Sequence, residues 1–337
     1  MRIKYLDNIR ALCMIWIVGI WHMSDYCGNA ISNVYTQNIT YGVLGAFTFL
    51  SGVMMGGNVI ESLQDFKLFY KKRLLRIYPL FAVSCTSLLL LHYLMNVQLI
   101  SGVSQYIFTM LGLSIILTPA PGTIWYVSMI LLFYILTPFL LYRHANGIKT
   151  AILLKSLIIF VFFILLKVVD VGLVDERLYM LFPIYCIGLL TGKEKILNSN
   201  CRYVRLLFGV IIFIGINYVE TKYVQTDFII KIMYTILVET AFVMFIMEFG
   251  KIFKGNIERC LSKVGYSSMC AYLFHRQFYG LFSKLFGRFS LVEAFMAFGV
   301  VIIFCFYIQK GYDLLCKKTL ILMERRNEKV DTGRSTA

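Results

Sequence analysis

The sequence runs Arg10-Ala-Leu-Cys-Met-Ile-Trp-Ile-Val-Gly-Ile-Trp-His22 near its N-terminus, an apolar stretch with an ionisable residue at each end. Helical residues rise by about 1.5 Å each, so the segment 11–28 can cross most of a hydrocarbon core of about 30 Å. His22 would then lie near the middle of the membrane. Because ionisable groups at such depth are costly, an intramembrane histidine indicates a functional site.

The rest of the chain repeats this apolar pattern. Hydrophobic residues make up 59% of the 337 residues and charged residues only 15%, well beyond the roughly even apolar share of a soluble domain. We therefore expect an all-α, polytopic bundle of about ten transmembrane helices, a multi-pass protein of the cell (inner) membrane. The predicted spans are 11–28, 40–58, 78–98, 124–142, 151–168, 177–192, 204–219, 228–249, 264–283 and 292–313.

The distribution of Lys and Arg predicts the orientation of these spans, because cytoplasmic loops carry the excess of basic residues. With ten spans and both termini in the cytoplasm, the outer segments hold only a few of them. The net charge of +15 then reflects inner loops that face anionic lipid, and no nucleic-acid partner is expected. We expect one integral membrane domain over residues 1–324 and a short cytoplasmic tail over 325–337.

The segment 103–118 is apolar enough to span the membrane, but it ends in Pro119-Ala-Pro-Gly122. Counting it as a span would invert every later loop and move the basic loops outside, against the usual bias. We therefore place this segment on the outer leaflet, or dipping into it.

The cysteines give no sign of a metal site. The chain has nine of them, scattered without paired spacing. Most fall in predicted spans or on the inner side. This pattern predicts neither a disulfide framework nor a zinc site, so we expect no metal.

Two arginines stand out in the inner segment 66–79. Its apolar residues recur at helical spacing, which predicts an interfacial helix with a basic face. Arg73 and Arg76 are three residues apart and so lie side by side on that face, where two guanidinium groups suit phosphate oxygens. An anchor on anionic lipid is the alternative, and for this segment taken alone it is the commoner explanation.

Three further motifs are each open to a structural explanation. The second span contains Phe47–Gly52, whose small residues are typical of close helix packing. Trp125 and Tyr126 begin the fourth span, where an aromatic belt at the interface accounts for them. His275 lies eleven residues into the ninth span, at the same depth as His22, so we expect the two histidines to approach one another and to line one cavity open on both sides. The alternative is that each only makes a hydrogen bond across helices.

Taken together and in order, these motifs resemble the acyltransferase 3 family of integral membrane acyltransferases. The resemblance covers nearly the whole chain, and each motif is weak alone. It rests on Tyr5-Leu-Asp-Asn-Ile-Arg10 with His22, Phe49-Leu-Ser-Gly52, Arg73-Leu-Leu-Arg-Ile-Tyr-Pro79, Trp125-Tyr-Val-Ser128 and Tyr272-Leu-Phe-His275.

The resemblance implies transfer of an acyl group, commonly acetyl, from a cytoplasmic acyl-CoA to a hydroxyl of a sugar. The acceptor would be a surface polysaccharide or its lipid-linked precursor, and membrane lipids would surround the protein. His22 matches the essential histidine of the family and Arg10 its partner arginine, while Arg73 and Arg76 match the arginines that hold the donor. Four further residues are expected to bind substrate: Ser51, Trp125, Tyr126 and His275.

One spacing departs from the family pattern. The family usually places ten residues between its arginine and its histidine, whereas eleven intervene between Arg10 and His22. One extra residue rotates the histidine by about 100° relative to the arginine. Either a local π-bulge absorbs the extra residue, or the pairing geometry differs.

Histidine suits this chemistry, because its pKa lets it act as a base near neutrality. Asp25 shares the helix face of His22 and is a candidate to orient its ring, although an aspartate at the outer interface is just as ordinary. Arg276 points away from His275 and needs its own partner, for which Glu239 is the best candidate.

Two other functions stay open. A transporter of small solutes or lipid-linked sugars would use His22, Glu239, His275 and Arg276 as a proton or substrate pathway. Transport, however, gives no reason for Arg73 and Arg76 beside the membrane. A noncatalytic sensor or scaffold on the same fold requires that His22 be dispensable.

Overall fold

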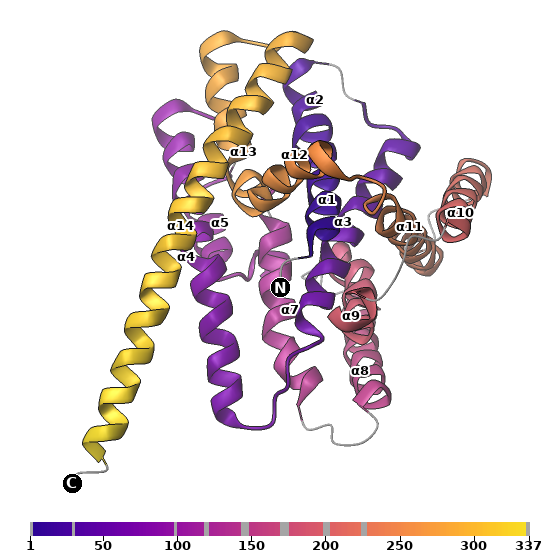
Figure 1. Ribbon diagram of the computed structural model, residues 1–337. Helices are drawn as coiled ribbons and strands as arrows, with labels where there is room; N and C mark the ends of the chain where they lie inside the picture. The colour runs from indigo at the N-terminus through magenta and orange to yellow at the C-terminus, as the bar shows by residue number, and fades with distance from the viewer. Residues whose placement is uncertain are drawn as a thin grey trace.

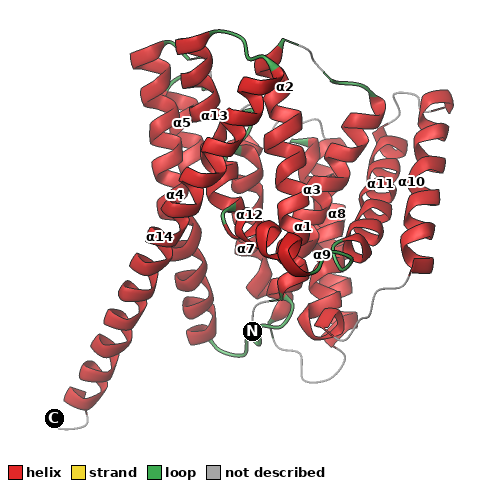
Figure 2. Ribbon diagram, turned by 45° about the horizontal axis from the view of Figure 1, so that its top comes forward, coloured by secondary structure: helices red, strands yellow, loops and turns green. Residues whose placement is uncertain are grey.

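The computed structural model describes residues 3–28, 31–97, 100–117, 121–142, 148–168, 175–197, 203–223 and 228–334. Within these ranges the chain is helical apart from connecting segments and one isolated bridge between Ile60 and Tyr142. The longer helices run roughly side by side as a bundle, and the C-terminal part of the last helix extends beyond it (Figure 1 and Figure 2).

Within the described ranges, five helices are long and apolar enough to cross a membrane. This agrees with an all-α membrane protein, whereas the number of about ten crossings and the cytoplasmic position of both termini stay predictions. The five are α3 (Val34–Met55), α4 (Leu63–Met95), α8 (Ile148–Val168), α11 (Phe228–Phe249) and α14 (Leu291–Arg334).

The other predicted spans also overlap helices. These are α7 (Trp125–Leu141), α9 (Glu176–Leu197), α10 (Tyr203–Tyr223), and α12 (Gly255–Tyr266) followed by α13 (Ser268–Phe286). The proposed boundary between residues 324 and 325 falls inside α14. The first span consists of three helical segments, α1 (Lys4–Met14), η1 (Ile15–Trp21) and α2 (His22–Cys27).

The doubtful segment 103–118 forms two short helices. They are α5 (Val103–Met110) and α6 (Ser114–Leu117), with a turn between them at Gly112, where φ is 71°. Eight helical residues rise only about 12 Å, less than half of a hydrocarbon core. Neither helix can cross the membrane, in agreement with the prediction.

One expectation about α4 is wrong. The segment 66–79 is not a separate interfacial helix, because α4 continues from Leu63 through Pro79 to Met95. Proline lacks an N–H group and leaves the carbonyl four residues earlier without its helical partner. The hydroxyl of Tyr312 on α14 donates to that carbonyl, on Leu75, and so replaces the missing hydrogen bond.

The centre of the bundle is a close crossing of α3 and α9. A Cβ atom on Gly52 would lie 2.2 Å from the carbonyl oxygen of Tyr185, and one on Gly188 would lie 2.4 Å from that of Phe49. Both positions therefore require glycine. The small residues of the second span serve close helix packing, the structural explanation given above.

Candidate active site

A π-helix, η1, lies between Arg10 on α1 and His22 at the start of α2. It covers Ile15–Trp21, and the N–H of His22 donates to the carbonyl oxygen of Ile17, five residues earlier. The structure therefore resolves the unusual spacing in favour of the first alternative, since π-helical turns absorb an extra residue. The hydroxyl of Tyr279 on α13 donates to the carbonyl of Val18 inside this π-helix, at 3.2 Å.

His22 and His275 meet inside the bundle. Nδ1 of His22 lies 2.7 Å from Nε2 of His275, and the two ring planes differ by 3°. The side chains are nearly or fully enclosed, at 8% and 0% exposed. The prediction that the two imidazoles approach one another is confirmed, while their roles stay a prediction.

The surroundings of His275 fix the protons on both neutral rings. Nδ1 of His275 lies 2.9 Å from the carbonyl oxygen of Tyr272 and 3.1 Å from that of Ala271. Carbonyl oxygens only accept hydrogen bonds, so Nδ1 carries the proton and Nε2 of His275 has the lone pair. His22 must then donate from its own Nδ1. Its Nε2 therefore has a lone pair, and that atom has no hydrogen-bond partner among the described residues.

The expected partner of Arg276 is wrong. Its Nη1 pairs with Asp25 at 2.8 Å and its Nε donates to Oγ1 of Thr123 at 3.0 Å. Glu239 instead lies fully buried beside Gly45, and both of its carboxylate oxygens lack a partner in the part of the chain that the structure describes. Asp25 also does not orient the ring of His22, because its carboxylate pairs with Arg276 and the ring of His22 contacts His275.

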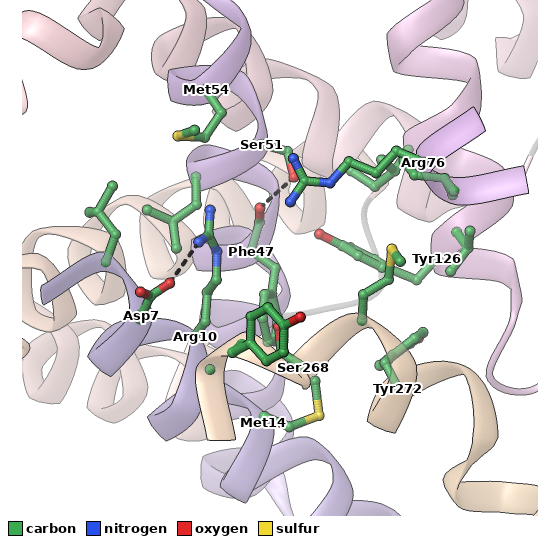
Figure 3. Close-up of a pocket in the computed structure, with 18 of the residues that line it drawn as sticks. Asp7, Arg10, Met14, Phe47, Ser51, Met54, Arg76, Tyr126, Ser268 and Tyr272 are labelled. Atoms are coloured by element: carbon green, nitrogen blue, oxygen red, sulfur yellow. Dashed lines mark hydrogen bonds and ion pairs between the residues drawn. The ribbon is translucent and has the colours of Figure 1, made fainter. Parts of the chain in front are cut away.

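A basic cavity of about 530 Å³ opens beside this pair, between α1, α3, α4, α7, α12, α13 and α14. Figure 3 shows Arg10 on α1 and Arg76 on α4 extending into it. Arg73 also lines the cavity, and its buried Nε has no partner among the described residues. Asp7 is the only acidic residue among the described residues that line it, and it pairs with Arg10 at 3.1 Å. The three guanidinium groups outnumber the one carboxylate, so this lining carries a net positive charge that favours an anionic ligand.

Arg10 is not a direct partner of His22. It lies in the cavity beside Asp7, whereas His22 contacts His275. Twelve residues of helix separate the two by roughly 18 Å. The resemblance implied that Arg10 and His22 are partners, but the two side chains are not in contact. Arg10 instead lines the same cavity as Arg73 and Arg76.

Neither histidine is among the residues that line the basic cavity, whereas Tyr272, three residues before His275 on α13, does line it. That the two histidines line one cavity open on both sides stays a prediction. Tyr272 stands between the cavity and the histidine pair, with its ring centroid 5.9 Å from that of His275. Its hydroxyl donates to the carbonyl oxygen of Thr123 at 2.6 Å.

The remaining candidates divide between the cavity and its surroundings. Ser51 and Tyr126 line the cavity, and the hydroxyl of Ser51 donates to the carbonyl of Phe47 at 2.9 Å. Trp125 does not line it, because its ring lies under the guanidinium of Arg177, 4.0 Å from the ring centroid.

Sequence reasoning missed several polar residues of the cavity. Asp7 could have been found, since it precedes Arg10 by three residues on one helix and so lies on the same face. Others come from distant helices, and no local pattern marks them. They are Tyr134, Tyr266, Ser268 and Gln309.

A comparison with family models identifies the family of the chain. A model described as an acyltransferase domain matches residues 3–310, a range that includes the histidine pair and the three cavity arginines. The protein is a membrane acyltransferase. The chain belongs to the acyltransferase 3 family, as its motifs implied. No match was found among curated proteins or among solved structures.

Proposed function

We propose that this membrane acyltransferase moves an acyl group, in the first instance acetyl, from a cytoplasmic acyl-CoA to a sugar hydroxyl. The acceptor is a surface polysaccharide or its lipid-linked precursor, and the protein works in the cell (inner) membrane. One observation carries the proposal: His275 holds His22 so that the Nε2 lone pair of His22 is left for chemistry.

The basic cavity is the donor site in this proposal. Coenzyme A carries several phosphate groups, and guanidinium groups bind phosphate oxygens through two parallel hydrogen bonds. Arg73 and Arg76 on α4, with Arg10 on α1, supply such groups around one space. Arg76 is exposed, so it lies where a donor would enter. Ser51 and Tyr126 also line the cavity and are less exposed than Arg76, so the pantetheine chain would lie against them.

His22 acts as the general base. Its Nε2 takes the proton of the acceptor hydroxyl while the hydroxyl oxygen attacks the thioester carbonyl carbon. The carbon–sulfur bond breaks, and the departing sulfur takes the proton back from His22, giving the O-acyl sugar and the free CoA thiol. His275 stabilises the imidazolium by accepting from its Nδ1–H. A two-step route, in which Nε2 itself takes the acyl group, uses the same lone pair.

Tyr272 controls access to the base. Because it stands between the cavity and His275, the acyl group reaches His22 only once the phenol has moved. Breaking its hydrogen bond to the carbonyl of Thr123 frees the side chain for that movement. Side-chain motions of this kind are fast compared with typical turnover.

Labelled acetyl-CoA tests the proposal. The full-length protein in lipid vesicles is incubated with [¹⁴C]acetyl-CoA and with surface glycan of the same cells, freed of its O-acyl groups by mild alkali. We expect label on the glycan, and a loss of about 10²–10⁴ in rate for His22→Ala. Label that stays on the donor would contradict the proposal and favour a transporter. If well-folded His22→Ala transfers the acyl group at the normal rate, His22 is not the base and the proposed mechanism is wrong.

A further inference from the structure

A second cavity, of about 130 Å³, lies on the other side of the Tyr272–Thr123 hydrogen bond. Thr123 lines it, whereas Tyr272 lines the basic cavity. Leu273 and Arg276, on either side of His275 along α13, also line it. The histidine pair is thus next to both spaces.

Gln277 is a wall of this second cavity and is only 7% exposed. Its Nε2 lies 3.3 Å from the carbonyl oxygen of Ser84, which can only accept, so this end of the amide is the NH₂ group. The same Nε2 donates to Oγ of Ser84 at 2.8 Å. That hydroxyl has already used its own proton on the carbonyl of Leu273, at 2.7 Å. The orientation of the amide is therefore fixed.

This orientation leaves Oε1 of Gln277 as a buried acceptor with no partner among the described residues. Buried acceptors are rarely left unsatisfied, because each costs free energy unless a donor meets it. The chain itself does not supply the donor within the described ranges. A bound ligand with a hydroxyl group would supply it.

Arg276 supplies the complementary group. Asp25 and Thr123 hold its guanidinium in place, and guanidinium nitrogens only donate. The cavity thus offers a fixed donor and a fixed acceptor, the pair that a sugar hydroxyl, itself both donor and acceptor, can use. The Asp25 side chain is 52% exposed, so this end of the site is next to the protein surface.

We propose that this second cavity binds the acceptor, and that Oε1 of Gln277 takes a hydrogen bond from a hydroxyl of a polyhydroxylated sugar ring while Arg276 donates to a neighbouring oxygen. The inference rests on the proposed function, since it assigns the second substrate of the same histidine pair. Donor and acceptor then reach His22 from two separate spaces, with Tyr272 between them.

Gln277→Leu removes the acceptor atom, together with the hydrogen bonds that Nε2 donates to Ser84, and keeps a side chain of similar size. The probe is the alkali-treated surface glycan of the same cells, titrated at saturating acetyl-CoA with the full chain in vesicles. We expect the half-saturating glycan concentration to rise roughly threefold to tenfold, the effect of one lost hydrogen bond. The half-saturating acetyl-CoA concentration should stay unchanged, which also reports that the variant is folded.

Gly122→Leu tests the same space in a second way. Gly122 lines the cavity, is exposed, and has no atom within 4 Å of the position of an added Cβ. A leucine there narrows the cavity without a backbone clash, so the half-saturating glycan concentration should again rise. Gly57→Leu is the matched control, since Gly57 is equally open but lines neither cavity. It should behave as the unmodified protein.

The outcomes separate the two proposals. Suppose that the unmodified protein transfers label to the glycan, but Gln277→Leu and Gly122→Leu leave the half-saturating glycan concentration unchanged. The proposed acceptor site is then wrong and the proposed function stands. If only the half-saturating acetyl-CoA concentration rises, the second cavity is part of the donor site and the inference is overturned. If the unmodified protein transfers no label, the proposed function fails first.

Discussion

Nδ1 of His22 donates to Nε2 of His275 across 2.7 Å, joining α2 to α13 over 253 residues of sequence. The carbonyl oxygens of Tyr272 and Ala271 hold the other nitrogen of His275. In the proposed mechanism His275 acts through His22 and is a positioning residue. In the same way, a hydrogen-bonded partner fixes the tautomer and direction of a catalytic histidine in other enzymes.

Removing His275 should slow transfer without weakening substrate binding. We expect His275→Ala to lower kcat by about 10–100-fold, the usual effect of losing an orienting partner, with KM for acetyl-CoA unchanged. His275→Gln keeps an acceptor oxygen for Nδ1 of His22 and should restore part of the rate. Steady-state kinetics check this. Equal loss in both variants would point to packing alone.

Lysine in place of either donor arginine should weaken donor use. Arg73→Lys and Arg76→Lys keep the charge but lose the forked guanidinium, so the half-saturating acetyl-CoA concentration should rise by roughly tenfold. Lys72→Ala is the control, because Lys72 is exposed on the same helix and does not line the cavity. If the arginine variants match the unmodified protein, these residues are lipid anchors.

Neutralising Glu239 should be harmless. Its carboxylate is fully buried without a partner among the described residues, so the charged form is costly there. Glu239→Gln has the same shape and should retain acyl transfer, with equal or higher thermal stability. Loss of activity in a folded variant would instead support a proton pathway of the transporter kind.

The crossing of α3 and α9 should not tolerate a methyl group. Gly52→Ala places Cβ against the carbonyl oxygen of Tyr185, so the two helices must move apart. We expect a loss of about 1–3 kcal/mol or more in stability, visible as a lower midpoint in thermal unfolding. Gly57→Ala, where the added atom meets nothing within 4 Å, is the control. Equal midpoints would show that the crossing is looser than described.

The depth of side chains could be predicted from sequence, whereas the direction in which they point could not. Counting residues along two spans placed His22 and His275 at one level. The eleven-residue spacing gave a π-bulge as one of two alternatives, and the structure has a π-helix there. The partner of Arg276 depends on how α13 is rotated relative to α2 and α11. Hydropathy carries little information on that rotation, because lipid-facing and buried positions are equally apolar.

Long-range contacts account for the other errors. The sequence predicts an interfacial helix over 66–79 and a span over 78–98. Tyr312 on a distant helix supplies the hydrogen bond that Pro79 cannot make, and α4 continues through both segments. Arg10 and Arg76 share a cavity because α1 and α4 meet there. A family motif names both residues without saying that they are neighbours.

A double-mutant cycle on the histidine pair tests the proposed mechanism most directly. Rates of acetyl transfer are compared for the unmodified protein, His22→Ala, His275→Ala and the double variant. If His275 works only by holding His22, then His22→Ala costs about 10²–10⁴ and losing His275 as well costs nothing more. Transfer by folded His22→Ala at the normal rate, or losses that simply multiply, would contradict it.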